Sequence, residues 1–223
     1  MPMARQLLSC PSLWSVTTVE AKTAVLVTST GSTGANKEIS LSAGALLASA
    51  KASNKFLNAN FGETWSLLLP LTHIAAVNVL VRSLELGTIP VNLIGHDGEY
   101  PKVDYTAIVP TQLFNALTGD DRLLKHLQSA KAVLVGGATL TAELQEQATN
   151  AGISVVTTYG MSETSGGCVY NGVPLEGVQV AISDAGFIKV LGSLFQCRAW
   201  RFGWRDQLQD SFRECSSSGR LLE

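Results

Sequence analysis

Between Thr23 and about Val190, short apolar runs alternate with segments whose apolar residues recur at helical spacing. This alternation constrains the fold most, because strands that alternate with helices build an α/β domain with layered, mostly parallel sheets and helices on both faces. In such domains ligands bind at the carboxyl ends of the strands. The polar segments that follow the apolar runs are therefore where a functional site is expected.

The pattern predicts five strands and three helices. The strands are expected at Ala24–Thr28, Trp65–Leu69, Ala107–Val109, Ala132–Val135 and Ile153–Thr157. One helix is expected from the N-cap Ser42, with an inward face of Leu46, Leu47, Ala50 and Leu57. The second is expected to end at Gly87 and to face inward through Val77, Leu80, Val81 and Leu84. The third is expected from the N-cap Thr141 to near Gly152, with Leu144 and Ala148 inward.

Composition excludes several classes of protein. The 223 residues are 46% hydrophobic with a formal net charge of -2, which argues against disorder and against coating nucleic acid. The best candidate for a membrane span is interrupted by Arg82 and Glu85, and the N-terminus lacks the apolar stretch of a signal peptide. No cysteine has a partner at zinc-binding spacing. These features predict one main globular domain in the cytoplasm.

The segment from Thr28 to Lys37 has the residue types of a phosphate-binding loop. Glycines let backbone N–H groups approach an anion, hydroxyls donate hydrogen bonds, and a lysine supplies positive charge. The candidate ATP-binding residues are Thr30, Gly31, Ser32, Thr33, Gly34 and Lys37. The two glycines are too close together for a Walker A loop, which argues against an unrelated phosphate-binding NTPase. A flexible turn is the alternative.

This segment resembles the phosphate loop of the adenylate-forming superfamily, T-S-G-[ST]-T-G-x-P-K-G. Asn36 stands where that family usually has proline, and Glu38 stands where it usually has glycine. A carboxylate beside a triphosphate would repel it by about 1 kcal/mol or more. The departure at Glu38 therefore predicts either that this side chain points away or that nucleotide binding is weakened.

Two further segments resemble motifs of the same family, in the same order. Leu69–Ala75 is similar to L-P-x-x-H-x-x, which implies that His73 lies near the bound carboxylate substrate. Val133–Ala138 is similar to the glycine-rich loop that packs against adenine, through Gly136, Gly137 and Ala138. A packed histidine and an ordinary tight turn are the alternatives for these two segments.

The most specific resemblance is Thr158–Thr164, close to the family motif Y-G-x-[ST]-E-T. It implies that Tyr159 stacks on adenine, that the Ser162 hydroxyl meets the phosphate and that Glu163 contacts Mg²⁺. An aromatic face suits a base, and a hard carboxylate suits a hard cation. The expected nucleotide-binding residues here are Tyr159, Gly160, Met161 and Ser162.

Within the superfamily, the chain most resembles the o-succinylbenzoate-CoA ligases of menaquinone biosynthesis. The resemblance lies in His73–Ser83, Ile108–Leu113 and Gly166–Leu175. It implies that Arg82, nine positions after the histidine, clamps the substrate carboxylate that does not react. It also implies that Gly166 and Gly167 leave room for the aromatic ring. A surface arginine, or one paired with Glu85, is the alternative for Arg82.

The resemblance implies a ligase reaction in two halves. The carboxylate attacks the α-phosphorus of Mg·ATP to give an acyl-adenylate and pyrophosphate, and the thiol of coenzyme A then displaces AMP. Lys37, His73 and Glu163 are the candidate catalytic residues, and Glu163 is the candidate metal ligand. The expected partners are ATP, Mg²⁺, coenzyme A as co-substrate and a small aromatic carboxylate, without nucleic acid or membrane. Whether the chain forms a homo-oligomer is left open.

The resemblance covers about Thr23 to Leu194 and predicts the domain organisation. Residues 1–22 are expected to be a short lead-in, residues 23–192 a fragment of the AMP-binding (adenylate-forming) domain, and residues 193–223 an atypical tail, frameshifted or disordered. The family's T-G-D motif, hinge and small C-terminal lid are not found. The expectation is therefore the large N-terminal domain of an adenylate-forming enzyme that lacks the lid, which the other reading frames beyond codon 195 would test.

Three functions stay open on this sequence. The first is the o-succinylbenzoate ligase, impaired by truncation because the lid would bring the adenylation lysine and the hinge. The second is a catalytically silent remnant that binds nucleotide or substrate. The third is an acyl-CoA ligase for another carboxylate.

Overall fold

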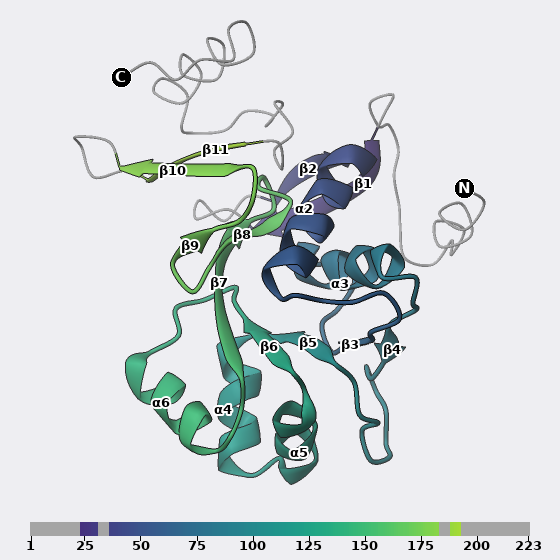
Figure 1. The fold of residues 1–223 in the computed structure, drawn as a ribbon, viewed down its shortest axis with the longest axis vertical. Coiled ribbons are helices and arrows are strands. Elements are labelled where there is room, and N and C mark those ends of the chain that lie inside the picture. Colours follow the sequence, from purple (N-terminus) through teal and green to yellow (C-terminus); the bar gives the residue numbers. More distant parts are fainter. Residues whose placement is uncertain (1–22, 31–35, 183–187, 193–223) are drawn as a thin grey trace, which may run out of the picture.

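The centre of the molecule is a seven-stranded sheet in the order β4-β3-β5-β6-β7-β8-β9 (Figure 1). The computed structural model describes residues 23–30, 36–182 and 188–192. Strands β4, β3, β5, β6 and β7 are parallel, while β8 and β9 are antiparallel to their neighbours. The strands are β3 (Trp65–Leu67), β4 (Val91–Asn92), β5 (Tyr105–Ile108), β6 (Ala132–Val135), β7 (Val155–Met161), β8 (Gly166–Tyr170) and β9 (Val173–Pro174). The predicted layered, mostly parallel α/β architecture is confirmed.

Helices cover both faces of this sheet. One face carries α2 (Ala43–Phe56) and α3 (Ile74–Glu85), and the other carries α4 (Pro110–Thr118), α5 (Asp121–Ser129) and α6 (Ala142–Asn150). Along β6, Leu134 belongs to the core beneath α2 and α3, whereas Val133 and Val135 belong to the core beneath the other helices. A strand buried on both faces needs apolar residues at every position, which explains its uninterrupted apolar run.

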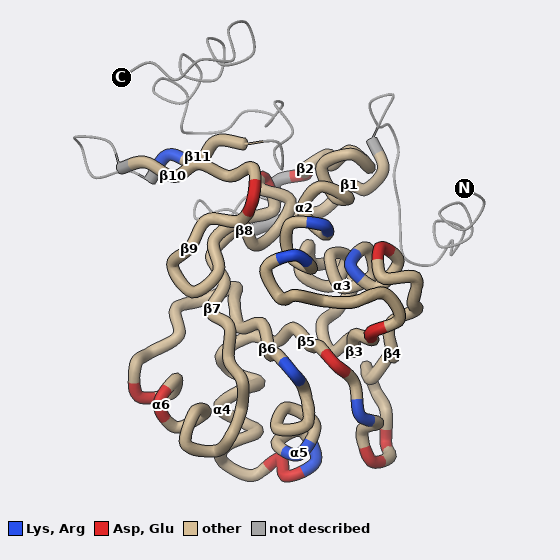
Figure 2. The backbone as a smooth tube through the Cα atoms, viewed as in Figure 1, with Lys and Arg blue, Asp and Glu red and all other residues tan. Residues whose placement is uncertain are grey.

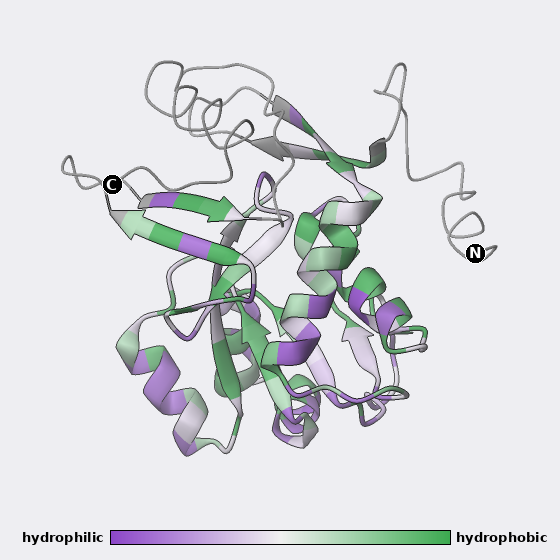
Figure 3. Ribbon diagram, turned by 45° about the horizontal axis from the view of Figure 1, so that its top comes forward, coloured by the Kyte–Doolittle hydropathy of each residue, from purple (hydrophilic) through white to green (hydrophobic). Residues whose placement is uncertain are grey.

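The distribution of hydrophobic and charged residues follows this layering. Figure 3 shows hydrophobic residues concentrated in the central strands, with hydrophilic residues on the outer helices and loops. None of the seven strands of the sheet carries a charged residue, and Figure 2 shows the charges on helices, loops and hairpins. Within the described residues, no helix combines the length and the apolar character that a membrane span requires.

Two separate hairpins accompany the sheet. The first pairs β1 (Thr23–Thr30) with β2 (Asn36–Ser42), and the second pairs β10 (Val178–Ile182) with β11 (Ile188–Gly192). The strand predicted at Ala24–Thr28 exists, but it lies in the first hairpin rather than in the parallel sheet. The sequence analysis missed β2, which stands between the predicted loop and helix α2 and buries Ile39 and Leu41 in a small third core.

The predicted helix boundaries agree with the structure. Ser42 caps α2, since its hydroxyl accepts a hydrogen bond from the Ala45 amide at 3.2 Å. Thr141 caps α6 through a hydrogen bond from the Leu144 amide at 3.3 Å. Gly87 follows the end of α3 with φ of +73°, a conformation that costs glycine little.

The predicted inward faces are less accurate. Leu47 of α2 is 42% exposed and Leu84 of α3 is 36% exposed, although both were expected in the core. The buried side of α3 instead includes Asn78 and Arg82. A hydrophobic pattern misassigns this helix because polar groups on β8 and on the turn before it provide hydrogen-bonding partners for its buried side.

Strand β7 is longer than predicted. Expected to end at Thr157, it continues to Met161 because β8 turns back and pairs with it from Thr158 onward, with a bulge between Tyr159 and Gly160. The Tyr159–Met161 segment therefore lies in a strand, not in a free loop.

Candidate functional site

Three of the predicted site segments follow parallel strands and therefore come to one edge of the sheet. His73 lies in the connection after β3, Gly136–Ala138 follows β6, and Tyr159–Met161 forms the end of β7. Because the strands are parallel, their carboxyl ends share one edge, called here the carboxyl edge. In Figure 1 the strand β7 runs from α6 toward β8 and β9 at this edge.

Hydrogen bonds join the connections at the carboxyl edge to one another. Gln112 Nε2 donates to the Leu68 carbonyl at 3.2 Å, which links the segments after β5 and β3. The Thr158 hydroxyl donates to the Val135 carbonyl at 3.2 Å, which links β7 to the end of β6. A Cβ at Gly136 would overlap the Thr158 hydroxyl, so the close approach requires glycine there.

His73 is exposed at the start of α3. Its backbone carbonyl accepts hydrogen bonds from the Ala76 and Val77 amides, and its side chain does not cap the helix. His73 is therefore not a packed histidine. His126 is one, since it is 2% exposed and hydrogen-bonded to Ser66 at 2.9 Å. Burial lowers the pKa of His126. The exposed imidazole of His73 is therefore accessible to a ligand at the carboxyl edge.

The end of β7 presents an aromatic and a thioether side chain. Tyr159 is 43% exposed and Met161 is 45% exposed, while Ser162 and Glu163 are half-buried in the turn that follows. Exposed apolar side chains at the end of a half-buried strand suit a flat ring such as a nucleobase.

The turn between β7 and β8 is closely hydrogen-bonded. The Thr164 hydroxyl accepts from the Met161 amide at 2.8 Å and can donate to the Gly166 carbonyl at 2.7 Å. Ser165 and Gly166 both have positive φ, +54° and +100°. Two consecutive residues in this region make a sharp turn, and only glycine adopts it freely.

The glycines of β8 lie in close contact with neighbouring side chains, and their expected role in leaving room for an aromatic ring stays a prediction. A Cβ at Gly166 would overlap Asn78 Nδ2, and a Cβ at Gly167 would lie 2.8 Å from the Tyr170 ring. These glycines therefore permit β8 to pack against α3 and against Tyr170. This packing arises because β8 pairs with β7 and contacts α3.

Arg82 is buried, being only 3% exposed, so the alternative of a surface arginine is wrong. Its guanidinium donates to the Tyr170 hydroxyl at 2.8 Å and lies 5.2 Å from the centre of the Trp65 ring. Glu85, the alternative partner, accepts a hydrogen bond from Asn54 at 2.7 Å instead. Among the described residues the partners of this cation are thus neutral, and its Nε has none.

The phosphate-loop candidates Gly31, Ser32, Thr33 and Gly34 lie outside the described residues. Thr30 and Lys37 are described only in their backbone, at the ends of β1 and β2 beside that segment. Glu38 is exposed on β2 opposite Thr28.

Glu163 is the carboxylate that the sequence analysis proposes as the magnesium ligand. No group of three or more His, Cys, Asp or Glu residues that could hold a metal occurs in the described part of the chain. Mg²⁺ is typically held by one or two carboxylates together with substrate phosphates and water. Glu163 alone is therefore compatible with a magnesium ion that arrives with a nucleotide.

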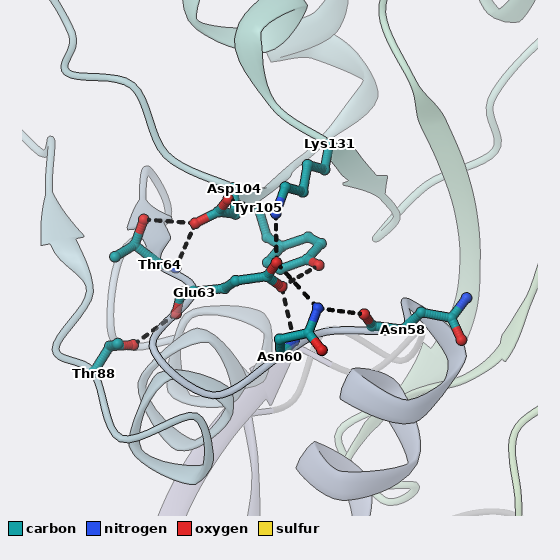
Figure 4. A network of polar contacts seen from close by, with 8 residues as sticks. All are labelled: Asn58, Asn60, Glu63, Thr64, Thr88, Asp104, Tyr105 and Lys131. Atoms are coloured by element: carbon teal, nitrogen blue, oxygen red, sulfur yellow. Dashed lines mark hydrogen bonds and ion pairs between the residues drawn. The ribbon is translucent and has the colours of Figure 1, made fainter.

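The sequence analysis missed a polar cluster at the opposite edge, where the parallel strands begin (Figure 4). Lys131, just before β6, forms ion pairs with Glu63 and with Asp104, the latter at 3.0 Å. Asp104 also accepts a hydrogen bond from the Thr64 amide at 2.8 Å, and Tyr105 donates to Glu63 at 2.7 Å. These contacts join the starts of β3, β5 and β6.

The cluster shifts the ionisation of its members. Burial alone would raise the pKa of Glu63, but hydrogen bonds from Lys131, the Asn60 amide and Tyr105 outweigh it and lower that pKa to about 2. Hydrogen bonds to Glu63 and Asp104 raise the pKa of Lys131. The cluster lies away from the carboxyl edge, and its contacts indicate a structural role.

The molecule is an α/β protein with a mostly parallel sheet. Its histidine, glycine and tyrosine segments are exposed at the carboxyl edge, where proteins with such sheets bind ligands. The chain belongs to the family of AMP-binding enzymes, whose family model matches residues 11–191. This assignment agrees with the resemblance to adenylate-forming enzymes that the motifs carry.

The relatives are more specific. A protein of Mycobacterium tuberculosis named probable 2-succinylbenzoate–CoA ligase is 41% identical over 187 residues, which cover 78% of this chain and 48% of that protein. The 2-succinylbenzoate–CoA ligase of Escherichia coli is 31% identical, over 68% of this chain and 35% of that protein. The chain therefore spans at most about half the length of these relatives.

Solved structures show the same fold. The o-succinylbenzoate coenzyme A synthetase from Bacillus subtilis, in complex with ATP and magnesium ion, superposes with a TM-score of 0.67 at 25% identity. The match covers 78% of this chain and 42% of the other. An acyl-CoA synthetase-like protein from Dyadobacter fermentans gives a TM-score of 0.65 at 26% identity, over 76% of this chain and 53% of the other.

Proposed function

We propose that this chain is the AMP-binding part of an ATP-dependent acid–thiol ligase that makes o-succinylbenzoyl-CoA in menaquinone biosynthesis, in the cytoplasm. The observation that carries the proposal is the meeting of His73, Gly136–Ala138 and Tyr159–Met161 at one edge of the sheet. Two relatives named for this ligase activity support the substrate, and a solved complex with ATP and magnesium supports the nucleotide.

The adenine of ATP is proposed to lie at the carboxyl edge. Its ring would stack on the exposed Tyr159 and lie against the backbone after β6 and along the end of β7. The contributing residues are Gly136, Gly137, Ala138, Gly160 and Met161. The phosphates would be bound by Ser162 and by the loop from Thr30 to Lys37, and Glu163 would hold the magnesium ion that accompanies them.

The aromatic dicarboxylate is proposed to lie between His73 and Arg82. His73 is exposed beside the carboxyl edge. A residue that contacts the reacting carboxylate must be accessible in this way. Arg82 is a buried cation whose partners among the described residues are neutral, and burying a charge without a counter-charge is costly. A second carboxylate on the substrate would offset that cost, which favours o-succinylbenzoate over a monocarboxylate.

The proposed reaction has two balanced steps. A carboxylate oxygen of the substrate bonds to the α-phosphorus of ATP, the bond from that phosphorus to the bridging oxygen breaks, and pyrophosphate leaves. The sulfur of coenzyme A then bonds to the acyl carbon, and AMP leaves as the thiol loses its proton. Lys37 and Ser162 would act by positioning and by neutralising charge on the phosphates.

The test measures acyl-adenylate formation by the purified 223-residue chain with Mg·ATP and o-succinylbenzoate, by mass spectrometry. Benzoate and acetate serve as substrates without the second carboxylate. Arg82→Met is expected to abolish the preference for o-succinylbenzoate. Arg122→Met is the matched control, because Arg122 also lies over an aromatic ring, 4.4 Å from the centre of Tyr100, but on α5.

Each outcome decides between functions. Adenylate formed only with o-succinylbenzoate supports the proposed ligase. Adenylate formed equally with benzoate indicates a ligase for another carboxylate. A folded protein that forms no adenylate with any acid refutes first-step activity in this chain, leaving the silent nucleotide- or substrate-binding remnant.

A further inference from the structure

Helix α3 connects two segments of the proposed site. It begins directly after His73, and five residues further along, Asn78 contacts the turn that carries Ser162 and Glu163. Asn78 is 1% exposed in the middle of an otherwise largely apolar segment. A buried amide on an apolar helix is unfavourable unless it is hydrogen-bonded, so its contact must be accounted for.

That contact is with the backbone of the turn. Asn78 Nδ2 donates to the Ser165 carbonyl at 2.7 Å, and the Ser49 hydroxyl of α2 donates to the same carbonyl at 3.2 Å. Gly166 lies directly against the Asn78 amide, where any Cβ would overlap it. Two helices therefore hold one carbonyl, at the point where the chain has positive φ at two successive residues.

The turn transmits this position to the site. The Thr164 hydroxyl bridges the Met161 amide and the Gly166 carbonyl, and the Ser165 amide donates to the Ser162 carbonyl at 3.0 Å. Because these hydrogen bonds connect the residues of the turn, a shift of the Ser165 carbonyl would also move Ser162 and its neighbour Glu163. The first turn of the same helix fixes the backbone of His73, whose carbonyl accepts hydrogen bonds from the Ala76 and Val77 amides.

We infer that Asn78 is a positioning residue that sets the Ser162–Glu163 turn at a fixed place relative to His73. Its consequence for ligand binding rests on the proposed function, whereas its effect on the turn does not. If Asn78 only filled the core, leucine, with a similar volume and no polar group, would replace it without a local effect. If Asn78 positions the turn, leucine removes the donor to Ser165 and the turn loosens.

The test compares Asn78→Leu with Ser66→Ala by hydrogen exchange of backbone amides. Ser66 is also fully buried and hydrogen-bonded, to Thr106 at 2.7 Å and to His126, but it lies away from the turn on β3. In Asn78→Leu the amides of Thr164 and Ser165 are expected to exchange at least tenfold faster relative to the amides of β6 in the same protein. In Ser66→Ala that ratio is expected to stay at the wild-type value.

An unchanged ratio in Asn78→Leu would overturn the inference. Should that variant not fold, Asn78→Ser, which is smaller and cannot reach Ser165 with an amide, takes its place under the same criterion. The affinity for Mg·ATP, measured by calorimetry, is expected to fall at least tenfold in the Asn78 variant and to be unchanged in Ser66→Ala. If the wild-type chain does not bind Mg·ATP, the proposed function fails, and the exchange ratio alone decides the positioning role.

Discussion

Replacing Glu63 by glutamine tests the polar cluster where the parallel strands begin. The Glu63 side chain is 13% exposed, accepts hydrogen bonds from the Asn60 amide at 2.8 Å and from Tyr105 at 2.7 Å, and pairs with Lys131. These partners lower its pKa from 4.5 to about 2. Glutamine keeps the shape but removes the charge, so the substitution isolates the ionic part of the cluster.

The expected magnitude follows from that pKa. A fall of about 2.5 corresponds to about 3.4 kcal/mol at most, at about 1.36 kcal/mol for each factor of ten in the acid constant. The partner Lys131 is 55% exposed, and solvent screens such a pair. Glu63→Gln is therefore expected to lower the free energy of unfolding by about 1–2 kcal/mol at pH 7.

The pH dependence gives the sharper test. A carboxylate whose pKa is lowered by folding contributes stability that is fully present above about pH 4.5 and is lost as pH falls toward about 2. The difference between wild type and Glu63→Gln, measured by urea unfolding, should be constant from pH 7 to about 5.5. For a contribution of about 1–2 kcal/mol it should shrink to roughly one-fifth of its full value or less by pH 3.

An exposed pair provides the control. Lys55 and Glu176 are 2.8 Å apart, but their side chains are 68% and 65% exposed. Glu176→Gln should therefore change the free energy of unfolding by less than about 0.5 kcal/mol at every pH. Equal effects of the two substitutions, or a Glu63→Gln effect that does not depend on pH, would refute the reasoning.

Three further substitutions have distinct expected outcomes. His73→Ala should leave the urea midpoint nearly unchanged because the side chain is exposed, while adenylate formation falls roughly 10²-fold or more; retained activity would exclude His73 from the site. Leu113→Ala, in the core beneath α4, should cost about 2–5 kcal/mol in urea unfolding, and a smaller loss would mean a looser core. Gly136→Ala should cost about 1–3 kcal/mol and weaken Mg·ATP binding in calorimetry, since its Cβ would overlap Thr158; an unaltered protein would contradict the close approach of β6 and β7.

The predictions from sequence succeeded where local patterns were decisive. The run Ala132–Val135 was predicted as a strand with the bounds that the structure has, because four apolar residues in a row fit a strand buried on both faces. The caps Ser42 and Thr141 were also identified, since a hydroxyl just before a helix accepts a hydrogen bond from an amide three residues later in the same helix. The candidate site segments at His73, Gly136 and Tyr159 were proposed from motifs, and their placement on one edge follows from the parallel strands.

Other features depended on partners distant in the sequence. Strand β2 was missed because it is stabilised by pairing with β1. The predicted end of β7 came too early because the last residues of this strand pair with β8. A single window of sequence contains neither partner. The expected inward position of Leu84 failed for a related reason, since the buried side of α3 is defined by contacts with β8.

The sequence by itself determined the layered α/β class, the order of the site segments and the family, because hydrophobic periodicity and short motifs are local properties. Only the tertiary structure decided which polar residues are buried. Asn78 meets Ser165 across 87 positions, and Lys131 meets Glu63 across 68. Hydrogen bonds and ion pairs act over a few ångströms, so their partners are fixed by how strands and helices pack and not by distance along the chain.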